Sequence, residues 1–333
     1  MNRPIALVTL GEAMLRFSPP NHERLEQATC FDVHIGGSEL NTAAAAVCVG
    51  LPARFVTRLP RNPLGRMVER KAREHGVDVS CIAWTDEDRV GTYYLEFGAA
   101  PRANSVVYDR RHSAIARISK GEIDWAAAFA GATAFHTSGI TPALSPSAAE
   151  ATLEAVAEAK SAGLLVSIDL NYRERLWSEA EARRVMTEIV RSADVLITTE
   201  EDTQRVFGIE RDSYEDVART LVETYGLKVV AITLRENLSV WRNRWTAIAY
   251  EAATDEVHRA PVFDIEVVDR VGSGDAFVGG FLRGYLDGDV ASGVLHGVGI
   301  SAIKQTHPGD VAYTTPGEIE RVLAGGGGLR IVR

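Results

Sequence analysis

Short apolar runs alternate with longer segments of helical periodicity from about residue 133 onward. The runs TAFHTSG, LLVSID, VLITT and KVVAITL indicate buried strands, because each is short, apolar and bounded by polar or turn-forming residues. Ser145-Pro146 predicts the start of a helix. Ala149, Leu153 and Val156 would share the apolar face of that helix. Strands that alternate with helices predict right-handed crossovers and a mostly parallel sheet covered by helices on both faces.

Local signals place several other helix ends. Ser178-x-x-Glu181 has the pattern of a capping box, in which each side chain bonds the backbone of the other residue. A second helix should end near Phe207-Gly208. Thr315-Pro316-x-Glu318 predicts the start of a last short helix, and a flexible run Gly325–Gly328 should follow it.

Two early regions carry strand patterns with no helix between the strands. Residues 11–35 contain EAMLRFS and FDVHI, and residues 89–109 contain GTYYLEF and SVVYD. We expect these segments to pair as a small antiparallel sheet. Because they are inserted between α/β units, they are better interpreted as a lid than as a separate domain. The sequence therefore predicts one α/β domain over residues 1–333, with a central mostly parallel sheet, flanking helices and a small β-sheet lid.

The composition is that of an ordinary globular protein, with 46% hydrophobic and 24% charged residues. The net charge is −9 and no run of Lys or Arg forms a basic stripe, so we expect no nucleic-acid partner. Cys30, Cys48 and Cys81 show no paired metal-type spacing and indicate free thiols in a reducing compartment. No signal-like segment and no apolar stretch of membrane-spanning length is found, so we expect a cytoplasmic protein without a membrane partner.

The run from Asp269 to Asp275, DRVGSGD, is the most informative stretch of the chain. Gly272 and Gly274 permit backbone angles that direct successive N–H groups into one concavity. The helix that follows adds unpaired N–H groups and a partial positive charge, which together form a site for a phosphate or oxyanion. Asp275 then handles a proton during phosphoryl transfer, or it only favours the helix dipole as any first-turn acid does. The motif alone leaves both interpretations open.

A second glycine-led helix start lies in HIGGSELNTAAAAVCVG. Gly36 and Gly37 would let a ligand approach the backbone closely, and Asn41 lies one turn into the helix. The alternative is a tight turn in front of an alanine-rich packing helix. We favour a ligand role, because the motif follows a strand of the predicted lid.

Polar residues also follow three of the predicted strands, where ligands bind in open parallel sheets. These segments are 137–139 (TSG), 169–173 (DLNYR) and 198–202 (TTEED). Arg173 could hold a carboxylate or phosphate with two parallel hydrogen bonds. For Glu200 and Glu201 we favour the simpler interpretation of a polar loop.

Other motifs carry no function. The run from Gly297 to Ala302 matches the dinucleotide pattern G-x-G-x-x-A, but no strand precedes it and the helical pattern continues through it. The eight histidines are scattered and predict no zinc site, and a G-x-S-x-G nucleophile motif is absent.

Taken together, GGSELN and VDRVGSGDAFVGG resemble the two signatures of the ribokinase-like (PfkB) family of sugar kinases. Their order, their wide separation and the early strand insertions extend the resemblance over nearly the whole chain. Within the family, the phrases GTYYLEF, SVVYDRRHSA, SGITPALS and DLNYRERLWS are most similar to 2-keto-3-deoxygluconate kinases.

The resemblance implies a role for each matching residue. Asp275 resembles the catalytic base, and Gly272, Ser273 and Gly274 would line the anion hole. Gly36, Gly37 and Asn41 would meet the sugar acid. Further substrate contacts match Tyr93, Tyr108, Arg110, Ile140 and Arg173.

The resemblance also implies ATP and Mg²⁺, although the nucleotide positions depart from the family pattern. The family's Asn-x-x-Glu is replaced by Thr199-Glu-Glu-Asp202, which keeps one carboxylate and loses the amide. The expected nucleotide loop TLRENLSVW, with Thr233 and Arg235, has no glycine. His296 stands where the family often has Asn near the adenine. No metal ligand is assigned with certainty, and the sequence does not reveal whether a monovalent cation is required.

The leading hypothesis is ATP-dependent phosphorylation of 2-keto-3-deoxygluconate to its 6-phosphate. The alternatives are a sibling kinase for 2-keto-3-deoxygalactonate, fructose or ribose, and a catalytically weak sugar-binding sensor. Because the lid of this family often pairs with a second subunit, the resemblance also suggests a homodimer.

Overall fold

The structure is a computed structural model that describes residues 5–325, and within this range its main sheet has nine strands. These are β1 (Leu7–Leu10), β4 (Ala53–Val56), β9 (Ala134–Ser138), β10 (Leu165–Asp169), β11 (Val195–Thr198), β12 (Val229–Ser239), β13 (Arg242–Glu251), β14 (Glu256–Arg259) and β15 (Phe263–Glu266). The order is β14-β13-β12-β11-β10-β9-β1-β4, and β15 also pairs with β13. Neighbours from β12 to β4 are parallel, and β13 pairs antiparallel with β12, β14 and β15. The predicted mostly parallel sheet is confirmed.

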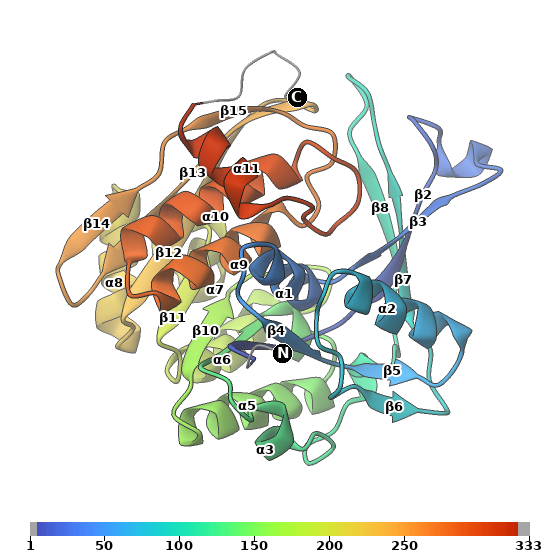
Figure 1. The fold of residues 1–333 in the computed structure, drawn as a ribbon, viewed down its shortest axis with the longest axis horizontal. Coiled ribbons are helices and arrows are strands. Elements are labelled where there is room, and N and C mark those ends of the chain that lie inside the picture. Colours follow the sequence, from blue (N-terminus) through green and yellow to red (C-terminus); the bar gives the residue numbers. More distant parts are fainter. Residues whose placement is uncertain (1–4, 326–333) are drawn as a thin grey trace.

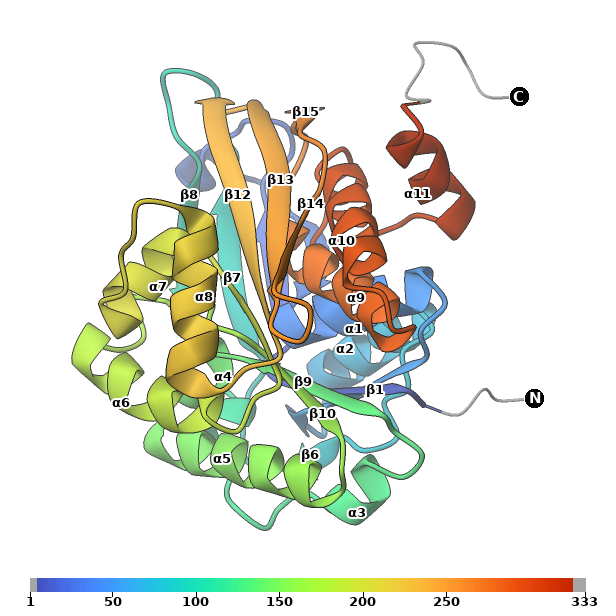
Figure 2. The same cartoon turned by 90° about the vertical axis from the view of Figure 1, so that its left-hand side faces the viewer.

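Helices cover both faces of this sheet (Figures 1 and 2). One face carries α5 (Pro146–Ser161), α6 (Glu179–Val190), α7 (Glu200–Phe207) and α8 (Tyr214–Tyr225), and the other carries α1 (Ser38–Cys48), α9 (Ser273–Leu286) and α10 (Val290–Lys304). Strand residues alternate between the two resulting cores: Val8 and Leu10 face α5, whereas Leu7 faces α1. The remaining elements are η1 (Leu25–Gln27), η2 (Ile115–Arg117), α2 (Pro63–Glu74), α3 (Trp125–Ala128), α4 (Ile140–Ala143), α11 (Pro316–Leu323), β5 (Arg58–Pro60) and β6 (Ala83–Thr85).

The predicted helix ends are confirmed by the capping contacts. Ser145, Ser178 and Thr315 each accept a backbone N–H in the first turn of α5, α6 and α11. Gly208 ends α7 in the left-handed conformation. Of the predicted run Gly325–Gly328, all but Gly325 lies outside the described residues. The dinucleotide-like run Gly297–Ala302 lies inside α10, as expected.

The predicted apolar face of α5 is rotated from the observed one. The buried residues of α5 are Ala148, Ala151, Thr152, Ala155, Val156 and Ala159. Ala149 and Leu153 lie only half-buried at the edge of this face. Small alanines bring α5 close to the sheet, and a pattern built on the larger side chains missed them.

The segment TLRENLSVW, expected as a nucleotide loop, is mostly strand. β12 continues to Ser239 and forms a long hairpin with β13, in which Arg235 lies opposite Trp245. The prediction was wrong because polar residues on a sheet extension that projects into solvent lack the apolar run that marks a buried strand.

A separate four-stranded sheet stands beside the main body (Figure 1). Its strands are β2 (Met14–Ser18), β3 (Asp32–Gly36), β7 (Gly91–Glu96) and β8 (Ser105–Asp109), in the order β3-β2-β7-β8. The predicted lid segments are thus strands of one sheet. The expected antiparallel pairing holds for β2/β3 and β7/β8, but β2 and β7 are parallel. Both strands leave the main body side by side, since Met14 pairs with Gly91 at their first residues.

None of the helices formed by residues 5–325 has the length and apolar character needed to cross a bilayer.

Candidate active site

A cleft of about 730 Å³ lies between the carboxyl ends of the parallel strands and the four-stranded sheet. Along its floor, Asp169 and Thr198 are the last residues of β10 and β11, Ile140 follows β9, and Thr233 lies within β12. Tyr93 and Tyr108 come from the four-stranded sheet. Most residues expected in the site line this cleft: Gly37, Asn41, Tyr93, Tyr108, Arg110, Ile140, Arg173, Thr199, Asp202, Thr233, Arg235, Gly272, Ser273, Gly274 and Asp275.

Two helix N-termini meet at Asp275. α1 begins at Ser38 and α9 begins at Ser273, so the carboxylate lies in the first turn of α9 and faces the first turn of α1. Ser38 Oγ donates a hydrogen bond of 2.7 Å to Oδ1, and Asn41 Nδ2 donates one of 2.8 Å to Oδ2. Burial raises the pKa of Asp275, while these two hydrogen bonds and the nearby Arg173 act in the opposite direction. The two hydrogen bonds hold the carboxylate in place, and its affinity for a proton is higher than that of an exposed Asp.

The turn before α9 depends on Gly272. Its φ is +82°, and a Cβ added there would lie 1.9 Å from the carbonyl oxygen of Asp310. At Gly274 an added Cβ would meet no atom within 4 Å. The backbone conformation and the close contact with Asp310 therefore require glycine at position 272, whereas a side chain at position 274 would enter open space. We use the name anion loop for residues 270–274.

Asp169 and Asp202 form an acidic patch on the cleft floor. Burial, together with Asp275 and Asp202, raises the pKa of Asp169 well above its ordinary value. Burial also raises the pKa of Asp202, and Arg173 opposes this. Asn171 Nδ2 donates to Ser38 Oγ at 3.1 Å and to Asp169 Oδ2 at 3.3 Å, which links the patch to Asp275. Among the described residues no cluster of three or more His, Cys, Asp or Glu side chains that could hold a metal ion is found.

Arg110 and Tyr108 lie on the lid side of the cleft. The Arg110 guanidinium forms an ion pair with the buried Glu12, and its Cζ lies 5.6 Å from the centroid of the Tyr108 ring. Tyr108 in turn stacks on Tyr93 at 5.6 Å between centroids. Arg110 Nε is buried and has no hydrogen-bond partner within the protein. An unpaired buried donor of this kind favours an acceptor on a ligand.

Arg270, the first residue of the anion loop, and the neighbouring Arg235 also line the cleft. Burial and the neighbouring Arg235 lower the pKa of Arg270. Arg270 Nη2 donates to the carbonyl of Val240 at 2.7 Å, but Nε is buried without a partner. Two adjacent guanidinium groups favour a polyanionic ligand here.

Two of the expected residues do not line the cleft. Gly36 lies behind it, where an added Cβ would meet Asp310 Oδ1 at 2.3 Å. His296 is on α10, where its Nδ1 lies 2.8 Å from the carbonyl oxygen of Ser292. Their ligand contacts stay predictions. Conversely, sequence reasoning did not select Glu12, Glu39, Arg270 or Asp310, all of which line the cleft. Arg270 could have been found, since it lies inside the DRVGSGD motif.

Glu39 is a buried carboxyl in the first turn of α1. Its Oε1 accepts hydrogen bonds from Ser138 N at 3.0 Å, Ser138 Oγ at 2.6 Å and Thr141 Oγ1 at 2.9 Å. Gly11 makes room for this side chain, because an added Cβ would lie 1.9 Å from Oε2. Burial raises the pKa of Glu39 to about 7, despite these hydrogen bonds.

This raised pKa predicts a pH-dependent stability difference between the wild type and Glu39→Gln. Between the ordinary 4.5 and about 7 the folded protein holds a proton that the unfolded chain has lost, so ionisation of Glu39 destabilises the wild type as the pH rises. Gln does not titrate. We expect the free energy of unfolding of Glu39→Gln, relative to wild type, to rise by about 3 kcal/mol between pH 4.5 and 8.

Urea titrations over this pH range measure the difference, and Glu188→Gln at an exposed position of α6 is the control. A Glu39→Gln difference that stays constant with pH would contradict the raised pKa.

Comparisons with known proteins agree on one family. The sequence model described as "pfkB family carbohydrate kinase" matches residues 5–315. A 2-dehydro-3-deoxygalactonokinase of Haloferax volcanii is 39% identical over 323 residues, covering 96% of this chain and 97% of that relative. The crystal structure of a 2-dehydro-3-deoxygluconokinase from Thermotoga maritima has a TM-score of 0.93 and 40% identity, covering 97% of this chain and 99% of the other.

A more distant structure, described as a ribokinase II from E. coli in complex with ATP and Mg²⁺, has a TM-score of 0.84 and 19% identity. The match covers 96% of this chain and 99% of that chain, and at this identity it shows a shared fold.

Proposed function

The chain belongs to the pfkB family of carbohydrate kinases and has the ribokinase-like fold, and on this premise we propose that it phosphorylates the terminal hydroxyl of 2-keto-3-deoxygluconate with ATP. The family and the fold class expected from the sequence are confirmed. The observation that carries the specific proposal is the position of Asp275, a buried carboxylate directly after the anion loop in a cleft that Arg110, Arg173, Arg235 and Arg270 also line.

The arginines support a sugar acid as the acceptor. Arg110 has a buried Nε without a partner in the protein, and Arg173 lines the same cleft. A sugar acid brings a carboxylate, which accepts two parallel hydrogen bonds from one guanidinium. The hydroxyl groups of a neutral sugar can also accept from Arg110, but as uncharged acceptors they form weaker hydrogen bonds than a carboxylate does. Tyr93, Tyr108 and Ile140 would enclose the carbon chain from the lid and the sheet.

Arg235 and Arg270 support a triphosphate as the donor. Both line the cleft beside the anion loop, and each lowers the free energy of an anionic ligand placed between them. Thr199 and Asp202, at the start of α7, and Thr233, on the neighbouring strand β12, line the cleft and would contact the nucleotide phosphates or their metal. Asp169 and Asp202 line the same cleft and could face a cation bound with the nucleotide. Mg²⁺ bound there with ATP would neutralise charge on the phosphates.

The proposed reaction uses groups that already lie together. Asp275 accepts the proton of the terminal hydroxyl as its oxygen forms a bond to the γ-phosphorus. The bond from the γ-phosphorus to the bridging oxygen breaks, and ADP leaves with that electron pair. Backbone N–H groups of Gly272, Ser273 and Gly274 stabilise charge on the transferring group. Closure of the lid would exclude water that could otherwise hydrolyse ATP.

A second candidate is the galactonate epimer of the same acid. The 39% identity to a 2-dehydro-3-deoxygalactonokinase favours it specifically. The two acids differ only in the configuration of one hydroxyl, so the same carboxylate contacts would hold both. Fructose and ribose kinases and a weakly catalytic sensor remain further alternatives, and the complete loop around Asp275 argues against the sensor.

The experiment that tests the proposal is ADP release with ATP and Mg²⁺ over both keto-deoxy acids, gluconate, fructose and ribose. Turnover confined to the keto-deoxy acids supports the substrate class, and the ratio of kcat/KM between epimers selects the substrate. Preference for a neutral sugar would contradict it. Sugar binding without turnover would favour the sensor.

Arg173→Ala should weaken the binding of acid substrates selectively. Loss of a charged hydrogen-bonding partner raises the KM for a keto-deoxy acid by about 10-fold or more, with a smaller effect on any neutral sugar that reacts. Arg110 is not used, because its removal would leave Glu12 buried without its partner. Steady-state kinetics measure the effect, with Arg184→Ala at an exposed position of α6 as the control. An equal loss on neutral sugars would count against a carboxylate contact.

The outer face of the lid supports the predicted homodimer. Val33, Phe17, Tyr94 and Val107 lie opposite one another in register and form an apolar row across all four strands. Val33 and Val107, at the two ends of the row, are 44% and 51% exposed, and Phe17 and Tyr94 between them are half-buried. A sheet that is apolar on both faces favours a second covering layer. We expect sedimentation to show a dimer, and Val107→Asp to shift it toward monomer; a monomeric wild type would contradict the proposal.

A further inference from the structure

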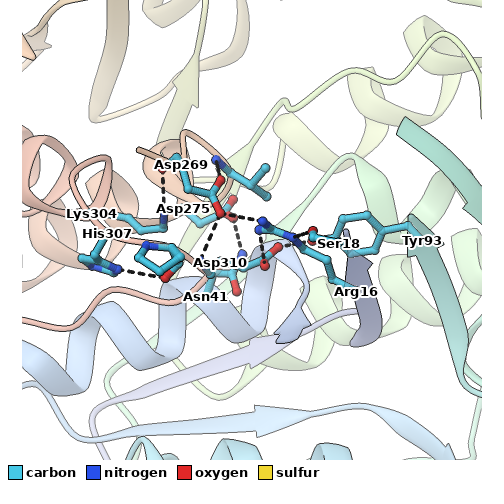
Figure 3. A network of polar contacts seen from close by, with 12 residues as sticks. Arg16, Ser18, Asn41, Tyr93, Asp269, Asp275, Lys304, His307 and Asp310 are labelled. Atoms are coloured by element: carbon cyan, nitrogen blue, oxygen red, sulfur yellow. Dashed lines mark hydrogen bonds and ion pairs between the residues drawn. The ribbon is translucent and has the colours of Figure 1, made fainter. Parts of the chain in front are cut away.

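Lys304 is a fully buried lysine at the last residue of α10. Its Nζ donates a hydrogen bond of 2.8 Å to the backbone carbonyl of Asp269 (Figure 3). A lysine is almost never fully buried unless its charge is paired. Lys304 does not line the cleft, so the proposed reaction gives it no direct contact with a substrate.

Asp269 directly precedes the anion loop, and hydrogen bonds hold both its side chain and its backbone. Its Oδ1 accepts from Val271 N at 3.0 Å, and its Oδ2 accepts from Gly309 N at 3.0 Å. Its own N–H donates to the carbonyl of Gln305 at 3.1 Å. The bond from Lys304 fixes the remaining polar atom, the peptide oxygen. The orientation of that peptide sets where the next N–H groups of the loop point.

Lys304 is one of four buried charged residues that interact with one another. Arg16, on lid strand β2, forms ion pairs of 2.7 Å with Asp269 and 2.9 Å with Asp310 (Figure 3). All four side chains are buried, with residue exposures of at most 2%. Burial lowers the pKa of Lys304, and Asp269 and Asp310 oppose that effect. Two carboxylates are thus balanced by two cations, and without Lys304 the group would carry one uncompensated negative charge.

We propose that Lys304 is a positioning residue whose ammonium acts as a built-in monovalent cation: it fixes the Asp269 carbonyl and with it the anion loop. The enzyme therefore needs no added K⁺ or NH₄⁺. The role of the loop in phosphoryl transfer rests on the proposed function. The balance of two positive and two negative charges and the hydrogen bond to Asp269 do not depend on the proposed function.

The test compares wild type with Lys304→Ala in choline, K⁺ and NH₄⁺ chloride at equal ionic strength. Direct chromatography of ADP avoids a coupling enzyme that could itself respond to the cation. We expect wild type to vary less than about twofold, while kcat of Lys304→Ala falls about 10- to 100-fold in choline. NH₄⁺ or K⁺ should restore at least a fifth of the wild-type kcat, and the KM for the sugar acid should change little. Lys71→Met, on an exposed part of α2, is the control.

Thermal melting in the same salts gives a second readout that does not need turnover. We expect NH₄⁺ or K⁺ to raise the Tm of Lys304→Ala and not that of wild type, even if the proposed substrate is wrong. Activation of wild type by K⁺, full activity of Lys304→Ala in choline, or loss of its activity without rescue by either cation would overturn the proposal. If Lys304→Ala does not fold, the wild-type comparison and Lys304→Met decide: Met fills the space without a charge, so its kcat should fall with no rescue by either cation, and full activity of Lys304→Met would overturn the proposal.

Discussion

Asp275→Asn is expected to lower kcat by about 10²- to 10⁴-fold while the affinity for the sugar acid changes little. The carboxylate is the proposed proton acceptor, and an amide cannot take up a proton at neutral pH. The change also turns one of the two acceptor atoms into a donor, so the Ser38 hydroxyl must accept from the new amide and its hydrogen bond to a carboxylate is lost. That loss costs about 1 kcal/mol of stability and is partly offset because a buried charge is removed.

Rapid-quench kinetics and calorimetric titration of the sugar acid separate these effects. Asp216→Asn is the matched control, because Asp216 is also a first-turn acid, in α8, and does not line the cleft. If Asp275→Asn retained wild-type turnover, Asp275 would be only a dipole-stabilising residue. If it lost sugar binding as well, its main role would be to hold the two helix starts together.

Gly272→Ala should abolish most activity and destabilise the protein, whereas Gly274→Ala should fold like wild type. At Gly272 the new methyl group meets the Asp310 carbonyl and the residue keeps a positive φ, which costs about 2 kcal/mol or more. Relief of the clash requires movement of the anion loop, so we expect kcat to fall at least about 100-fold. At Gly274 the methyl group enters open space.

Urea unfolding and steady-state kinetics of the two variants show whether each glycine is needed for the backbone conformation or for the approach of a ligand. A loss of activity in Gly274→Ala with normal stability would mean that the phosphate approaches this peptide closely. Equal stability of both variants would contradict the strained conformation assigned to Gly272.

Local motifs account for the parts of the site that the sequence predicted. The glycine-led starts of α1 and α9 are each encoded within a few residues, so Asp275, Gly272 and Asn41 could be assigned before their meeting was known. The strands that carry Asp169 and Thr198 were also evident, because parallel strands buried on both faces are continuous apolar runs.

The remaining parts depend on contacts between distant segments. Asp310 follows α10 in a stretch without periodicity, and its partner Arg16 lies 294 residues away. The β12/β13 hairpin that places Trp245 opposite Arg235 has polar faces, so no apolar pattern marks its length. Lys304 resembles any helix-terminal lysine, where a cation also favours the dipole; only the fold shows that it is buried against Asp269.

The most direct test of the central claim is ³¹P NMR of the product formed from ATP and 2-keto-3-deoxygluconate by the wild-type enzyme. Transfer to the terminal primary hydroxyl predicts a phosphomonoester signal split into a triplet by the two protons of the adjacent carbon, together with equimolar ADP. A doublet, which indicates a secondary alcohol, or inorganic phosphate with no ester would contradict the account.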